Sequence, residues 1–94
     1  VRWNESAAAD RYATLLKLSS VATDQHGYTP TEALARRLEE LAAAGGLHAG
    51  LSGVGIKKDE LADLAGEAAE QWTGTFNPRP FSKEGAMEVY ACAY

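Results

Sequence analysis

The sequence predicts an all-α fold of about four helices. Apolar residues recur at helical spacing in four stretches, and most of these stretches begin after a Ser or Thr, which are good N-caps. No stretch alternates apolar and polar residues over strand length with β-branched enrichment. Much of the apolar content is alanine, which favours closely packed helices over a bulky core. A chain of 94 residues is long enough for one domain, so we expect a single helical domain over residues 1–94.

The first helix is expected at about residues 7–19, with Ser6 as its N-cap. The preceding residues 1–4 are typical of the end of an element that begins upstream. Positions on adjoining parts of one face of the first helix are Ala8, Tyr12, Leu15 or Leu16, and Ser19.

The second helix has the clearest start in the chain. Thr29 is a cap, Pro30 takes the first helical position, and Glu32 is placed to reach back in a capping box. Gly45 and Gly46 end the helix, because glycine suits the left-handed conformation that follows a last turn. The apolar ridge of this helix is expected at Leu34, Leu38 and Leu41.

The third helix is expected to open at Lys58-Asp59-Glu60, after a glycine-rich loop. The apolar residues of that loop are expected to tuck inward: Leu47, Leu51, Val54 and Ile56. Helical spacing then links Leu61, Leu64 or Ala65, Ala68 and Trp72. In the fourth helix, Ser82 is the cap and Glu84 lies in the first turn. Its apolar face is expected at Met87, Tyr90, Ala91 and Tyr94.

Residues 71–81, between the third and fourth helices, lack helical periodicity but carry Trp72, Phe76 and Phe81 and an Asn-Pro turn signal. A solvated linker would be poor in Trp and Phe, so we expect a loop that packs against the core. Ordered loops are where binding and catalytic groups concentrate. On composition alone, however, the three aromatic residues are more typical of a plug between two helices than of a site.

Charge and composition exclude several classes of function. The net charge is −4 and the nine basic residues form no stripe, so we expect no nucleic-acid partner. No apolar run approaches the length of a membrane span, and no signal peptide is visible, so we expect no membrane partner either. The lone Cys92 fits a reducing compartment, and we expect the protein to be cytoplasmic.

No complete catalytic or metal-binding set is visible, so we predict neither catalytic residues nor metal ligands in this chain. His26 and His48 lie in separate loops, without a carboxylate or a cysteine at ligand spacing. Cys92 has no His partner, and the glycine-rich loop meets neither dinucleotide-binding nor P-loop spacing. The acidic residues at the start of the third helix are explained by the helix dipole.

Three motifs together resemble the C-terminal part of the helical domain of the iron-containing (group III) alcohol dehydrogenase family. The first is Asn77-Pro78-Arg79-Pro80, followed by a short capped helix that ends in Tyr94. The second is the stretch from Gly55 to Ala65, which is similar to the family's G-(V/I)-x-x-(E/D)-(D/E)-(L/I)-x-x-L-A segment. The third is Val1-Arg2-Trp3-Asn4 with Ala7-Ala8 and Arg11-Tyr12, similar to the stretch after the family's L-P-x-V helix. Their order and spacing agree with the family over nearly the whole chain.

The resemblance implies a partial dehydroquinate-synthase-like helical domain from a larger two-domain enzyme. Such enzymes interconvert alcohols and aldehydes by hydride transfer with NAD(P), in a cleft between a dinucleotide-binding domain and the helical domain. A divalent metal, Fe²⁺ or Zn²⁺, is held there by one aspartate and three histidines. All four ligands precede the matched segment, so neither His26 nor His48 would be a ligand. This chain would hold no cofactor and would be inactive alone.

The resemblance also assigns roles to the loop. The residues that would form the substrate-cleft wall and shape substrate size are Trp72, Thr73, Gly74, Thr75 and Phe76. Asn77, Pro78 and Arg79 would brace the loop rather than take part in catalysis.

The expected partner is the upstream part of the same polypeptide. Its absence would leave the apolar faces of the first and fourth helices uncovered and would drive self-association into a homo-oligomer. An alternative interpretation is a free-standing helical interaction module that docks through Trp3, Trp72 and the C-terminal tyrosines. A folded remnant without activity is a further alternative.

Overall fold

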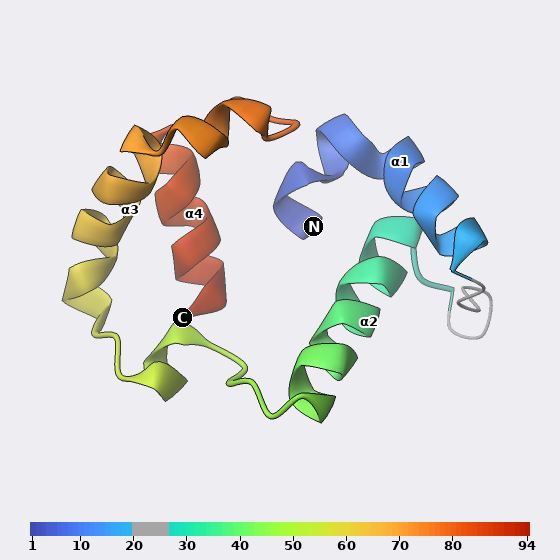
Figure 1. Cartoon of the computed structure of the whole chain (residues 1–94), viewed down its shortest axis with the longest axis horizontal. Helices are drawn as coiled ribbons and strands as arrows, with labels where there is room; N and C mark the ends of the chain where they lie inside the picture. Colours follow the sequence, from blue (N-terminus) through green and yellow to red (C-terminus); the bar gives the residue numbers. More distant parts are fainter. Residues whose placement is uncertain (20–26) are drawn as a thin grey trace. The chain divides into compact units, whose positions relative to one another are not determined.

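The computed structural model describes residues 1–19 and 27–94, which form two compact units, Val1–Gly45 and Gly46–Tyr94 (Figure 1). The described residues contain α-helices and short 3-10 helices and no strand, so the all-α prediction is confirmed. The longest of these helices has 15 residues, and none in the described ranges is both long and apolar enough to cross a bilayer.

The first unit consists of a 3-10 helix at Arg2–Asn4 (η1) and the α-helices Glu5–Leu18 (α1) and Pro30–Ala44 (α2). Its core lies between α1 and α2, where Leu16 is 2% exposed and packs with Leu34, Ala33 and Tyr12. The predicted face of the first helix is therefore confirmed, with Leu16 rather than Leu15 as its buried leucine.

The start of α1 differs from the prediction. The helix begins at Glu5, its N-cap is Asn4, and Ser6 lies inside it, so the prediction of Ser6 as the cap is wrong. The reason is that η1 runs directly into α1. The Glu5 N–H already bonds to the Arg2 carbonyl, so no new cap is needed at the next residue, Ser6.

The start of α2 agrees with the prediction in part. Thr29 caps the helix by accepting a hydrogen bond from the Glu32 N–H at 3.3 Å, and Pro30 is the first helical residue. The carboxylate of Glu32, however, bonds to Arg2 Nε at 2.7 Å and to Arg36 Nε at 2.8 Å. The capping-box prediction is wrong because two guanidinium groups are stronger partners for a carboxylate than one backbone N–H.

The end of α2 is also as predicted. Gly45 is the C-cap, and Gly46 takes a left-handed φ of +73°. The apolar ridge is only partly buried, since Leu34 is in the core while Leu38 and Leu41 are about half exposed.

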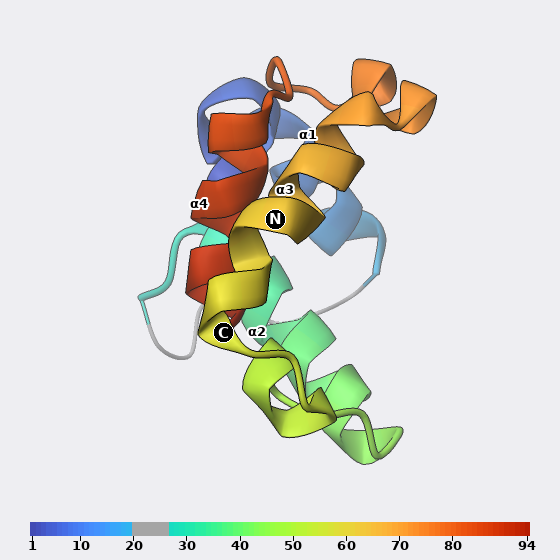
Figure 2. The ribbon, with the colours of Figure 1, turned by 90° about the vertical axis from the view of Figure 1, so that its left-hand side faces the viewer.

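The second unit contains the 3-10 helices Leu51–Val54 (η2), Lys58–Glu60 (η3) and Trp72–Phe76 (η4) and the α-helices Leu61–Glu70 (α3) and Lys83–Ala93 (α4). α3 and α4 lie side by side in two perpendicular views (Figures 1 and 2). Their buried residues are Leu61 and Ala65 on α3 and Gly85 and Ala86 on α4. Because most of these are small, the two helices can approach closely.

The buried residues of the fourth helix are not those of its predicted apolar face, which was also expected to be partly uncovered. Met87 and Tyr94 are exposed, and the buried face is centred on Gly85 and Ala86 instead. Small residues allow a closer contact with α3 than Met or Tyr would, so packing overrides the apolar pattern. The cap prediction for this helix is confirmed, since Ser82 Oγ accepts a hydrogen bond from the Gly85 N–H at 3.3 Å.

The glycine-rich loop contacts the backbone at the end of α4. Ser52 Oγ donates to the Tyr94 carbonyl at 2.8 Å, and a Cβ at Gly50 would lie 3.0 Å from the same oxygen. The expectation that all apolar residues of this loop turn inward is wrong for Leu47 and Val54, which are exposed. A single 3-10 turn cannot direct every side chain toward α4.

Candidate functional site

The candidate site is built on η4, which follows α3 without a flexible connection. α3 ends at Glu70, and Gln71 takes extended backbone angles. Bonds of the 3-10 type then follow, from the Gly74 N–H to the Gln71 carbonyl at 3.0 Å and from the Asn77 N–H to the Gly74 carbonyl at 3.1 Å. The prediction that Trp72 continues the face of the third helix is therefore wrong. Thr73, Gly74 and Thr75 are poor α-helix formers, which accounts for the change from α-helix to 3-10 helix.

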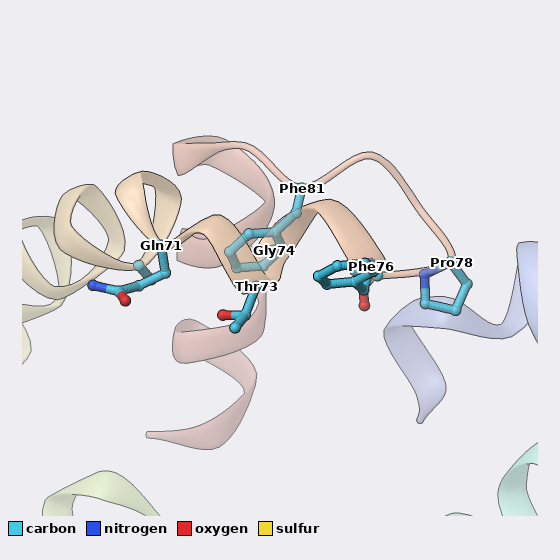
Figure 3. A pocket seen from close by; sticks show the side chains of 8 residues that line it. Gln71, Thr73, Gly74, Phe76, Pro78 and Phe81 are labelled. Atoms are coloured by element: carbon cyan, nitrogen blue, oxygen red, sulfur yellow. The ribbon is translucent and has the colours of Figure 1, made fainter.

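Gly74 allows the returning chain to pack onto η4. The ring of Phe81 lies against Gly74, and a Cβ at position 74 would be only 3.0 Å from Phe81 Cδ1 (Figure 3). Glycine is therefore required here for a close approach rather than for an unusual backbone angle.

The aromatic residues of this segment have different surroundings. Phe81 is half-buried, whereas Trp72 is 71% exposed and Phe76 is 75% exposed. The rings of Trp72 and Phe76 contact each other edge to face, with centroids 5.6 Å apart. The expectation that the loop packs its aromatic residues against the core is thus wrong for these two, whose rings pack on each other instead.

Two side chains hold the backbone of the segment. Thr75 Oγ1 donates to the Trp72 carbonyl at 2.8 Å within η4. In the turn that follows, Asn77 Nδ2 donates to the Arg79 carbonyl at 2.7 Å.

A pocket of about 490 Å³ opens beside η4. Its lining residues are Ala68, Gln71, Thr73, Gly74, Phe76, Asn77, Pro78 and Phe81. Figure 3 shows the rings of Phe76 and Phe81 on one part of the wall and the polar ends of Gln71 and Thr73 on another. A smaller pocket of about 130 Å³ lies near the same turn, and its lining includes Thr75, Arg79 and Pro80.

The structure thus brings together most of the predicted cleft-wall residues. Thr73, Gly74 and Phe76 line the larger pocket, Gly74 and Thr75 line the smaller one, and Trp72 is outside both linings. Among the predicted loop-bracing residues, Asn77 and Pro78 also line the larger pocket, and Arg79 lines the smaller one.

Sequence reasoning missed three lining residues, namely Ala68, Gln71 and Phe81. Ala68 and Gln71 are three residues apart at the end of α3, so their helical spacing was a signal that they share the side from which the loop begins. Phe81 was identified only as an apolar plug.

The side chains that line the larger pocket can bind a ligand but cannot transfer protons. They are aliphatic, aromatic, amide and hydroxyl groups, and none is an acid or a base near neutral pH. The rest of the described chain adds no metal centre, since residues 1–19 and 27–94 contain no group of three or more His, Cys, Asp or Glu that could hold an ion. His48 lies against Gly53, and Cys92 is exposed, whereas His26 falls outside the described residues.

The chain matches the family model described as "Fe-containing alcohol dehydrogenase family, C-terminal" over residues 1–94. Comparison with curated proteins and with solved structures returned no significant match. The family match covers the whole chain, including η4 and both pockets beside it. The chain therefore belongs to the Fe-containing alcohol dehydrogenase family and corresponds to the C-terminal region of that family.

Proposed function

We propose that this chain is the C-terminal helical part of a metal-dependent, NAD(P)-linked alcohol dehydrogenase and that η4 supplies a wall of its substrate cleft. The family match over residues 1–94 is the observation that carries the proposal. The pocket beside η4 supports it, because a small apolar hollow with a few polar groups is the usual form of a small-molecule site.

The described residues do not fit the role of a metal site. They contain no cluster of metal ligands, and we place the metal and the nicotinamide on the preceding part of a longer polypeptide. Bound there, the metal would act as a Lewis acid toward the alcohol oxygen, and the nicotinamide would supply or accept the hydride.

The contribution of this chain is to position substrate. The rings of Phe76 and Phe81 offer apolar surface to the carbon skeleton and exclude water from it. The amide of Gln71 and the hydroxyl of Thr73 offer hydrogen bonds to a polar substituent. Correct placement of the reacting carbon is itself a large part of catalysis.

The test compares the 94-residue chain with the same chain preceded by its natural upstream coding sequence. Each is assayed with Fe²⁺ or Zn²⁺, with NAD or NADP and with a panel of primary alcohols, by the absorbance of reduced nicotinamide. We expect turnover only from the longer polypeptide. The proposal is overturned by a longer polypeptide that is folded and metal-loaded yet inactive with every alcohol, or by a chain that is equally active alone.

One observation supports a second candidate, a helical module that binds another protein. Trp72, Phe76, Met87 and Tyr94 are all exposed, and aromatic residues are enriched where proteins dock. Copurification of one partner in fixed stoichiometry, without bound nicotinamide, would favour this function over the first.

A further inference from the structure

We propose that the pocket beside η4 selects alcohols and aldehydes that carry a flat, uncharged ring next to the reacting carbon, as in benzyl alcohol. This inference rests on the proposed function and deepens it, because it names the class of substrate for the same site.

The shape of the wall is the first support. Two phenyl rings, from Phe76 and Phe81, face a pocket whose other apolar surfaces come from Ala68 and Pro78 (Figure 3). Aromatic rings attract another ring in offset or edge-to-face arrangements, which a saturated chain cannot reproduce.

The Phe76 ring already makes one aromatic contact and is open to another. Its ring and that of Trp72 meet edge to face at an interplanar angle of 84°. The side chain nevertheless remains 75% exposed, which leaves a large ring surface for a ligand to cover.

The absence of charge in the lining is the second support. The lining residues of the larger pocket include amide and hydroxyl groups but no Asp, Glu, Lys, Arg or His. A charged substituent in this pocket would lose hydration without gaining an opposite charge, so this wall favours uncharged ring systems.

Size favours a small molecule over a polypeptide as the occupant. A volume of about 490 Å³ lies within the range of sites for small ligands, roughly 300–1,000 Å³. A specific protein partner would need a contact of about 800 Å² on each side, much broader than one hollow beside a single short helix.

Kinetics of the longer polypeptide provide the first test. Benzyl alcohol and cyclohexylmethanol have the same carbon skeleton but differ in planarity. We expect benzyl alcohol to have the higher kcat/KM, and Phe76→Leu to reduce the ratio of the two values by about two- to tenfold, the worth of one aromatic pair. Tyr94→Leu, which removes another exposed aromatic ring outside this pocket, should leave the ratio unchanged.

Ligand binding provides a second test that does not depend on turnover. The chain has two tryptophans, Trp72 beside the pocket and Trp3 in the other unit. Titration with benzyl alcohol should move the indole NMR signal of Trp72 and not that of Trp3, and cyclohexylmethanol should have a weaker effect.

The outcomes separate this inference from the proposed function. If no alcohol is turned over but Trp72 alone responds to benzyl alcohol, the enzyme proposal fails and the aromatic pocket stands. If alcohols are oxidised with a ratio that Phe76→Leu does not change, the pocket inference is overturned and the enzyme proposal stands. Loss of the Trp72 response in the longer polypeptide would also overturn the inference, because an upstream segment would then occupy the pocket.

Discussion

Leu61→Ala should strongly destabilise the α3–α4 unit and leave the stability of the α1–α2 unit unchanged. Leu61 is 1% exposed, and among the described residues Leu61 and Leu16 are the largest fully buried side chains. The two leucines lie in different units, and each unit has its own buried residues. A substitution in one core should therefore act mainly on the unit that contains it.

The expected effect is large relative to the stability of such a small unit. Replacing a buried leucine by alanine costs about 3–5 kcal/mol, through lost burial and the cavity left behind. At roughly 0.05–0.15 kcal/mol per residue, the whole free energy of unfolding of Gly46–Tyr94 is about 2–7 kcal/mol. The substitution should thus remove most of it.

Amide hydrogen exchange can follow both units in one sample. A loss of 3 kcal/mol corresponds to about a hundredfold faster exchange for amides that open with the α3–α4 unit, while amides of α1 and α2 should keep their protection. Leu47→Ala is the matched control, since Leu47 is in the same unit but 68% exposed. Its effect should stay within about 0.5 kcal/mol.

Two results would refute this reasoning. If Leu61→Ala accelerates exchange equally in all four helices, the two units unfold together and the cores are not independent. If it is no more harmful than Leu47→Ala, Leu61 does not hold α3 against α4. The reciprocal variant Leu16→Ala should affect only α1 and α2.

Three further predictions concern single residues. Gly74→Ala should cost about 1–3 kcal/mol in urea unfolding, because the new Cβ meets the Phe81 ring, and Phe81→Leu should restore part of the loss. The side-chain hydrogen bond from Arg2 lowers the pKa of Glu32 from 4.5. The pair therefore stabilises the fold at pH values above the ordinary Glu pKa, and this stabilisation is lost as the pH falls through the lowered pKa of Glu32. NMR titration should show that pKa rising toward 4.5 in Arg2→Gln. Leu18 is 79% exposed on α1, so Leu18→Glu should weaken concentration-dependent self-association in sedimentation, whereas a wild type that stays monomeric would contradict this.

The features that could be predicted from the sequence are those determined by neighbouring residues. Thr29-Pro30 and Ser82 begin helices because their caps use backbone groups within three residues. Side-chain contacts between residues far apart in the sequence could not be predicted in this way. The carboxylate of Glu32 bonds to Arg2, thirty positions away in the sequence, and no local pattern records that contact.

The candidate site shows the same limit. The aromatic loop could be recognised from its composition, but which of its rings would be covered depends on packing between α3 and α4. Phe81 packs on Gly74, and Trp72 and Phe76 do not share its half-buried position. The pattern of apolar residues alone treats the three rings as equivalent.

The distribution of large and small residues in the second unit explains why its aromatic surface is exposed. α3 and α4 use Ala65, Gly85 and Ala86 for their own contact, while Trp72 and Phe76 remain largely exposed. Fully burying one such ring is worth about 1.5–3 kcal/mol, a substantial share of the stability expected for this unit. A ligand that covers these rings should therefore stabilise α3 and α4 as well as bind to them. The α3–α4 unit should melt at a higher temperature with benzyl alcohol bound than without it, and Phe76→Leu should reduce that difference.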